Sequence, residues 1–228
     1  MFYRYELLNK VNLKHIQDFY NFSDFHDGKR TGSPNKDLKN NVEMQLEHTN
    51  GAWSIIWDLF CKHTVTRERL FACSSTVALF VKYTEGMHYN WHSDAPYMNK
   101  TDPGKSRSDF STTLFLNDPG EYEGGELLLR QGTEIREIKL PAGWAFTYPT
   151  GTEHKVNKII SGERRVAVWW TTSSLRNIED RQLAVYNCQA KEELLKNHPT
   201  AENPGDIDYL TYRALEEQIN SLMRFKGY

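Results

Sequence analysis

The stretch VALFVKYTEGMHYNWHSD, residues 77–94, combines a predicted strand, a turn and two candidate metal ligands. Residues 77–83 are mostly apolar, which predicts a strand that is largely buried, and residues 84–86 carry a turn signal. Downstream, the segment STTLFL at residues 111–116 predicts a further strand. His92 and Asp94 therefore lie in a connection between two strands, where loops on a rigid scaffold often carry function.

Two histidines and one aspartate in this region suggest a metal site. His92 and Asp94 are two residues apart, and in an extended chain such side chains point to the same side, so both can bind one ion. His154 follows a strand predicted over residues 143–149 and supplies a third ligand. Two histidines and one carboxylate leave coordination positions open, which suits non-haem Fe(II) oxygenases. The alternative is a chance H-x-D step in which the histidine is an ordinary surface residue.

The segment RRVAVWWTT, residues 164–172, predicts a long strand that begins with two arginines. Alternation places Arg164 on the same face as Trp170, and Arg165 on the opposite face. An arginine inside an apolar strand is unfavourable to bury without a partner, and a carboxylate would satisfy it through paired hydrogen bonds. The alternative is a solvent-facing arginine at a strand start, which we expect to describe Arg165.

Composition is consistent with one globular protein built around a sizeable core. The 228 residues are 39% hydrophobic and 13% aromatic, and the net charge of −2 makes a nucleic-acid partner unexpected. The odd number of cysteines, at 61, 73 and 188, argues against a disulfide framework. Because no signal-peptide pattern and no long apolar run is visible, we expect a cytoplasmic enzyme with no membrane partner.

The chain divides into three parts by pattern. Helical spacing recurs within residues 1–70, short strands separated by turns fill residues 71–175, and the polar tail predicts helices near 191–196 and 208–224. Gly124 and Gly125 are predicted to form a tight hairpin turn. The fold class is therefore mainly β with flanking helices (α+β), with the strands forming a sandwich or barrel of the jelly-roll type.

These motifs together resemble the Fe(II)/2-oxoglutarate-dependent dioxygenases of the prolyl 4-hydroxylase type. The resemblance lies in the pattern Y-x-x-G-x-x-Y-x-x-H-x-D at residues 83–94, the strand at 112–117, GGEL at 124–127, and His154 followed by Arg164 and Trp170. FHDG at 25–28, TG at 31–32, KNN at 39–41 and the stretch 107–119 are similar to the bacterial PKHD-type hydroxylases. Two positions depart from these patterns: Arg164 replaces the lysine of collagen-type enzymes, and Glu43 stands where the bacterial pattern tends to have glutamine.

The resemblance implies a double-stranded β-helix, cupin-like, with N-terminal helices and a helical C-terminal tail. It covers about residues 1–185, which we expect to be the catalytic dioxygenase domain, with N-terminal helices in 1–70 and the β-helix core in 71–175. Residues 186–228 are expected to be a helical extension.

The resemblance also implies the site. Fe(II) would be bound by His92, Asp94 and His154, which are also the expected catalytic residues, and 2-oxoglutarate by Arg164, with Tyr83 and Trp170 beside it. The alternative for Tyr83 is a structural role, as an aromatic residue at a strand end that is half buried in the core. O2 is the second co-substrate, and ascorbate is a candidate reductant.

The substrate implied by resemblance is a prolyl residue in a peptide or protein, hydroxylated with release of succinate and CO2. Tyr89, Trp91 and Tyr97 are candidate substrate contacts at the mouth of the site, although they fit lid packing equally well. The turn-rich residues 95–108 are a candidate lid, with a plain surface loop as the alternative.

Two alternatives remain open at this point. The enzyme could hydroxylate a free amino acid or other small metabolite, or the chain could be a non-catalytic, cupin-like metal-binding protein. Arg164 disfavours the second, because a simple metal-binding module has no need of a guanidinium ten residues beyond its last ligand. The sequence predicts no oligomeric state.

Overall fold

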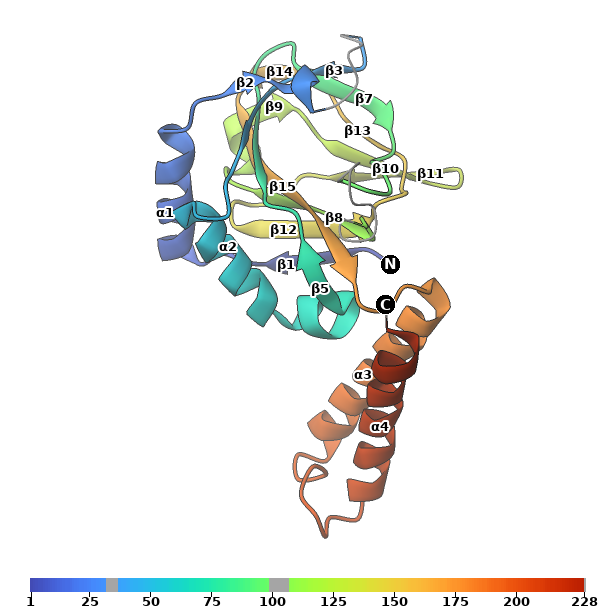
Figure 1. Cartoon of the computed structure of the whole chain (residues 1–228). Coiled ribbons are helices and arrows are strands. Elements are labelled where there is room, and N and C mark those ends of the chain that lie inside the picture. Colours follow the sequence, from blue (N-terminus) through green and yellow to red (C-terminus); the bar gives the residue numbers. More distant parts are fainter. Residues whose placement is uncertain (32–36, 99–106, 228) are drawn as a thin grey trace. The chain divides into compact units, whose positions relative to one another are not determined.

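The computed structural model describes residues 1–31, 37–98 and 107–227, and the chain divides into two compact units (Figure 1). The first unit comprises Met1–Cys61 and Ser74–Thr172, and the second comprises Lys62–Cys73 and Ser173–Tyr228.

The first unit is built from antiparallel sheets in which most neighbouring strands are not consecutive in the sequence. The larger sheet has the order β1 (Tyr3–Glu6), β12 (Trp144–Pro149), β8 (Phe110–Phe115), β15 (Arg164–Ser173), β6 (Leu79–Tyr83), β4 (Val42–Gln45) and β2 (His26–Asp27). The smaller sheet has the order β11 (Glu134–Ile138), β10 (Leu127–Gln131), β13 (His154–Val156), β7 (His88–His92) and β3 (Lys39–Asn40). β14 (Ile159–Gly162) pairs with β9 (Tyr122–Gly124), and β5 (Ala72–Ser75) lies where the chain re-enters the first unit.

One core joins the two sheets. Val81, Phe115 and Val166 of the larger sheet belong to the same buried cluster as Leu129 and Val156 of the smaller sheet. Burial of this apolar surface from both sides favours face-to-face packing of the sheets. The arrangement confirms the predicted fold class, a two-sheet jelly roll with flanking helices.

Helices α1 (Lys10–Asn21) and α2 (Gly51–Lys62) cover the outer face of the larger sheet (Figure 1). The ring of Phe60 on α2 lies 5.3 Å from that of Trp169 on β15, and Tyr20 on α1 lies 5.1 Å from Phe80 on β6. The helical spacing seen in the sequence is confirmed here. The same region also contains β1 to β4, which were not predicted because strands of two to four residues give little periodic signal.

The second unit is mainly a pair of helices, α3 (Ile178–Asn197) and α4 (Tyr209–Lys226), that contact each other along their length. α3 begins well before the predicted helix at 191–196, because Asn177 caps it by accepting hydrogen bonds from the Glu179 and Asp180 amides. The expected domain boundary at residue 185 lies inside α3. Among the described residues, none of the helices is both long and apolar enough to cross a membrane.

Candidate metal centre and co-substrate pocket

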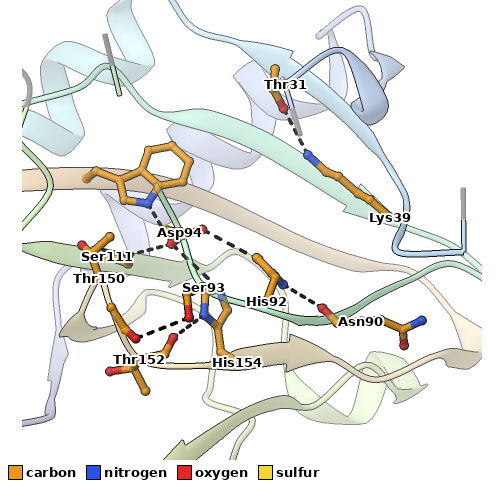
Figure 2. A network of polar contacts seen from close by, with 12 residues as sticks. Thr31, Lys39, Asn90, His92, Ser93, Asp94, Ser111, Thr150, Thr152 and His154 are labelled. Atoms are coloured by element: carbon orange, nitrogen blue, oxygen red, sulfur yellow. Dashed lines mark hydrogen bonds and ion pairs between the residues drawn. The ribbon is translucent and has the colours of Figure 1, made fainter. Parts of the chain in front are cut away.

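A cavity of about 230 Å³ lies in the core of the first unit, and it brings the predicted site residues together. His92, Asp94 and His154 line it together with Arg164 and Tyr83. Figure 2 shows the three candidate metal ligands pointing toward one another. His92 ends β7, Asp94 follows it, and His154 begins β13, which pairs with β7 so that the two histidines are direct cross-strand neighbours.

The three candidate ligands are close enough to share one ion. One ligand atom from each lies within 4.8 Å of the others. The Nε2 atom of His92 is 3.7 Å from Asp94 Oδ1, and the Nε2 atom of His154 is 3.8 Å from Asp94 Oδ2. Two imidazole nitrogens and one carboxylate oxygen are the donor set that suits Fe(II) with open positions for co-substrates.

Both histidine rings are held in the same way by their own backbone. Nδ1 of His92 lies 2.7 Å from the Asn90 carbonyl oxygen, and Nδ1 of His154 lies 2.9 Å from that of Thr152 (Figure 2). A carbonyl can only accept, so Nδ1 carries the proton and Nε2 presents its lone pair to the ion. Burial, helped by the neighbouring His154, lowers the pKa of His92 to about 4, which keeps the ring in the neutral form that binds metal.

Asp94 is oriented by two donors. The indole Nε1 of Trp170 donates to Asp94 Oδ2 at 2.8 Å, and the hydroxyl of Ser111 donates to the same oxygen at 2.7 Å. Trp170 lines the cavity, as predicted for an aromatic near the co-substrate, but its polar contact is with the metal-site carboxylate. Ser111 was not singled out in the sequence, because a serine within a strand carries no functional signal of its own.

A bulge in β7 determines on which side of the strand its aromatic side chains lie. His154 pairs with His92 and Val156 with Tyr89, so two residues on β7 oppose one on β13. The extra residue brings Tyr89 and His92 onto the same side, where their rings stack at 3.5 Å. Trp91 lies instead against basic side chains, 4.4 Å from the Arg130 guanidinium.

The three candidate substrate residues therefore differ in position. Among the described residues, Tyr89 lines the cavity, whereas Trp91 and Tyr97 do not. Tyr97 forms a bridge with Arg107 and is 37% exposed. Most of the candidate lid, residues 99–106, lies outside the described residues.

Arg164 is buried at the cavity with unused hydrogen-bonding capacity. The residue is 1% exposed, and its Nε has no hydrogen-bond partner within the described part of the chain. Its guanidinium lies 5.3 Å from the centre of the Tyr83 ring. Burial raises the pKa of Tyr83 to about 12, so its hydroxyl stays protonated at neutral pH. A buried cation and a hydroxyl that both line the cavity suit a carboxylate. Arg165 is partly exposed and pairs with Glu163 at 2.6 Å.

Gly124 and Gly125 do not form the predicted hairpin turn. Gly124 ends β9, which pairs with β14 rather than with the next strand, and both glycines have positive φ. A Cβ on Gly124 would lie 2.2 Å from the Lys158 carbonyl oxygen, and one on Gly125 would lie 3.1 Å from Arg164 Cδ. The glycines are needed for close approach of β14 and of Arg164, a requirement that sequence alone does not distinguish from a turn.

The sequence also did not predict that one wall of the cavity is polar. Thr31, Lys39, Asn41 and Glu43 line it. Their positions were noted only as part of the family pattern, without a role.

Comparison with known proteins defines the class. The model of the 2OG-Fe(II) oxygenase superfamily matches residues 78–172, which include all three candidate ligands and Arg164. The structure of a Pseudomonas putida prolyl-4-hydroxylase superposes with a TM-score of 0.60 at 15% identity, covering 75% of this chain and 91% of that one. The fold and site are those of an Fe(II)- and 2-oxoglutarate-dependent dioxygenase, an enzyme class that uses O2 as its second co-substrate.

Relatives over most of the chain define the family. A PKHD-type hydroxylase of Acaryochloris marina is 36% identical over 199 residues, covering 85% of this chain and 87% of that protein. One of Prochlorococcus marinus is 38% identical over 201 residues, covering 85% and 86%. The chain belongs to the PKHD-type hydroxylases. The alternative of a non-catalytic metal-binding protein is thereby rejected.

Proposed function

We propose that this enzyme hydroxylates a prolyl residue in a peptide or protein, with His92, Asp94 and His154 binding Fe(II) and Arg164 and Tyr83 binding 2-oxoglutarate. The donor set fits the metal, because three neutral or anionic donors converge and both imidazoles present Nε2. When bound, Fe(II) supplies the oxygen chemistry, in which 2-oxoglutarate and O2 yield succinate, CO2 and a hydroxyl on the substrate.

The protein's own residues bind and orient the reactants. The Arg164 guanidinium, buried and with its Nε unpaired among the described residues, is the partner for the far carboxylate of 2-oxoglutarate. Tyr83 offers a protonated hydroxyl to the same carboxylate. Trp170 and Ser111 hold Asp94 in place, and outer contacts of this kind commonly tune metal affinity.

A groove that continues the cavity is the observation that carries the peptide proposal. The groove has a volume of about 610 Å³ and shares Thr31, Leu79, Met98 and Trp170 with the cavity. The cavity itself, about 230 Å³, is below the roughly 300–1,000 Å³ of pockets that enclose a whole drug-sized ligand. With 2-oxoglutarate in the cavity, we place the reacting side chain of the substrate in the remaining space and the rest of the peptide along the groove.

A related fold is known to hold a peptide. A prolyl hydroxylase from Trichoplax adhaerens has been solved with a peptide fragment of hypoxia inducible factor, at a TM-score of 0.56 and 14% identity. This likeness concerns the fold, and it supports a peptide as the kind of substrate that the roll can accept.

A small metabolite is the second candidate. HygX from Streptomyces hygroscopicus, solved with 2-oxoglutarate and hygromycin B, has a TM-score of 0.55 at 9% identity. The polar wall of the cavity, with Lys39 and Glu43, is the observation that favours a small polar substrate.

Succinate release distinguishes the two candidates. The iron-loaded enzyme with 2-oxoglutarate and ascorbate would be offered proline-containing peptides and free amino acids, and products weighed by mass spectrometry. We expect succinate release to rise with a proline peptide, which should gain one oxygen atom. Stimulation by free amino acids alone would overturn the peptide proposal and favour the second candidate.

A further inference from the structure

A buried ion pair forms part of the cavity wall. Lys39 of β3 and Glu43 of β4 are in contact, with their side chains only 5% and 6% exposed. Removing two charges from water carries a penalty that their mutual attraction often does not offset. A pair of this kind at the wall of an active-site cavity therefore calls for a role beyond stability.

The backbone at Gly28 packs closely against Asn41 and Glu43. A Cβ on Gly28 would lie 1.9 Å from Asn41 Oδ1 and 3.0 Å from Glu43 Cδ, so the chain at residue 28 packs directly against the wall. The carboxylate of Glu43 is held by Lys39, by the Thr31 hydroxyl and by Asn41 Nδ2 at 3.4 Å. Its oxygens are thus occupied by the protein.

Lys39 has donor capacity to spare. An ammonium group has three N–H donors. Within the described residues two are used, one by Glu43 and one by Thr31 Oγ1 at 3.1 Å, the contact that Figure 2 shows. The Nζ atom lies 5.1 Å from the centre of the Tyr89 ring, which in turn stacks on His92. As far as the described residues go, one donor of Lys39 therefore remains without a partner, and it lies one ring away from the metal centre.

The charges that line the cavity cancel. Lys39 and Arg164 are balanced by Glu43 and Asp94, and Fe(II) and 2-oxoglutarate would balance each other. A charged substrate group would enter without a counter-ion, which is unfavourable in a buried site. A neutral acceptor such as a peptide carbonyl fits the free donor of Lys39.

We propose that Lys39 donates a hydrogen bond to a backbone carbonyl oxygen of the substrate beside the hydroxylated residue, and that Glu43 positions it. The inference rests on the proposed peptide hydroxylation and deepens it: the target is an internal residue with amides on both sides, rather than a free amino acid. Lys39 is then a specificity-determining residue and Glu43 a positioning residue.

The test removes the pair as a unit, because removing one partner would leave a buried charge uncompensated. The variant combines Lys39→Met with Glu43→Gln, so that position 43 keeps its contacts with Thr31 and Asn41. The control combines Lys14→Met with Asp18→Asn, an ion pair of the same four-residue spacing that is exposed on α1. The probe is a proline peptide blocked by acetyl and amide groups. The KM is measured for this peptide and for 2-oxoglutarate.

The variant should raise the KM for the blocked peptide about 10-fold or more, the effect of losing one charge-assisted hydrogen bond. The 2-oxoglutarate concentration for half-maximal turnover should stay within about twofold, because that carboxylate depends on Arg164. The control should change neither value. Glu43→Gln alone should shift preference toward a peptide ending in a free prolyl carboxylate, because Lys39 then lacks its counter-charge.

An unchanged peptide KM in the double variant would overturn the inference while leaving prolyl hydroxylation in place. An equal rise in the 2-oxoglutarate requirement would also overturn it, since the pair would then belong to the co-substrate site. If blocked peptides without proline stimulate the wild-type enzyme, the prolyl proposal fails, and the variant's KM for those peptides decides the role of Lys39. If no blocked peptide stimulates turnover, both proposals are wrong.

Discussion

The inner and outer faces of the sheets use similar residues for different purposes, and β15 shows the contrast within one strand. On the inner face, the side chains of Arg164 and Trp170 line the cavity, and Trp170 donates a hydrogen bond to Asp94. On the outer face, Trp169 is fully buried against the aromatic rings of α2, and Arg165 forms a partly exposed ion pair. The outer face thus contributes mainly to stability, and the inner face bears groups whose arrangement serves ligands.

The largest effect should come from the inner-facing metal ligands. His92→Ala, Asp94→Ala or His154→Ala should each abolish Fe(II)-dependent turnover of 2-oxoglutarate, because a site with open positions cannot spare a ligand. Thermal unfolding should change little. His88→Ala, on the same strand but outside the group of ligands, is the matched control. Near wild-type turnover at limiting iron in any of the three variants would contradict that ligand's assignment.

The adjacent tryptophans of β15 separate stability from metal binding. Trp169→Ala should lower the free energy of unfolding by about 3–5 kcal/mol, the usual effect of emptying a large core site. Trp170→Phe should leave unfolding nearly unchanged but weaken Fe(II) binding about 10- to 100-fold, through loss of the hydrogen bond to Asp94. Denaturant unfolding and metal titration measure the two effects. If Trp170→Phe bound iron normally, the indole would not be needed to orient Asp94.

The adjacent arginines of β15, Arg164 and Arg165, should differ in their effect on 2-oxoglutarate binding, because only Arg164 faces the cavity. Arg164→Ala should raise the 2-oxoglutarate requirement about 10- to 100-fold, corresponding to loss of a charge-assisted hydrogen bond of about 1.5–3 kcal/mol. Arg165→Ala should leave it within about twofold, because its partner Glu163 forms a partly exposed ion pair of the kind that contributes little. Titration of both variants with 2-oxoglutarate checks this. The reverse result would move the co-substrate site to the outer face.

The smallest contrast concerns two buried tyrosines. The hydroxyl of Tyr20 donates a hydrogen bond to the Val81 carbonyl at 3.1 Å. Tyr20→Phe should therefore lower the free energy of unfolding by about 1 kcal/mol and leave the 2-oxoglutarate requirement unchanged. Tyr83→Phe should raise the 2-oxoglutarate requirement by about fivefold. Because burial raises the Tyr83 pKa to about 12, this effect should be the same at pH 6 and pH 8. A pH-dependent effect would show that the hydroxyl ionises in this range.

The sequence allowed prediction of features with a local or periodic signature. His92 and Asp94 were found because they are two residues apart in an extended segment, and Arg164 because an arginine stands out in an apolar strand. The jelly roll followed from many short strands and from the family resemblance.

Features that depend on long-range packing were not predictable in this way. The opposite placement of Tyr89 and Trp91 depends on a bulge that only pairing with β13 defines. The wall of Lys39 and Glu43 lies on strands too short to show a period. The start of α3 depends on the cap at Asn177, which outweighs the polar character of the residues that follow.

The carbonyl contacts of the two histidines show that the tautomer of each ring is fixed locally, whereas the proximity of the two rings depends on the fold. In each case the acceptor is the residue two positions earlier, Asn90 for His92 and Thr152 for His154. Each three-residue segment therefore carries its own choice of tautomer, and the roll has only to bring two such segments side by side. Substitutions elsewhere in the domain can alter the spacing of the rings during evolution, but they do not change which nitrogen each ring presents.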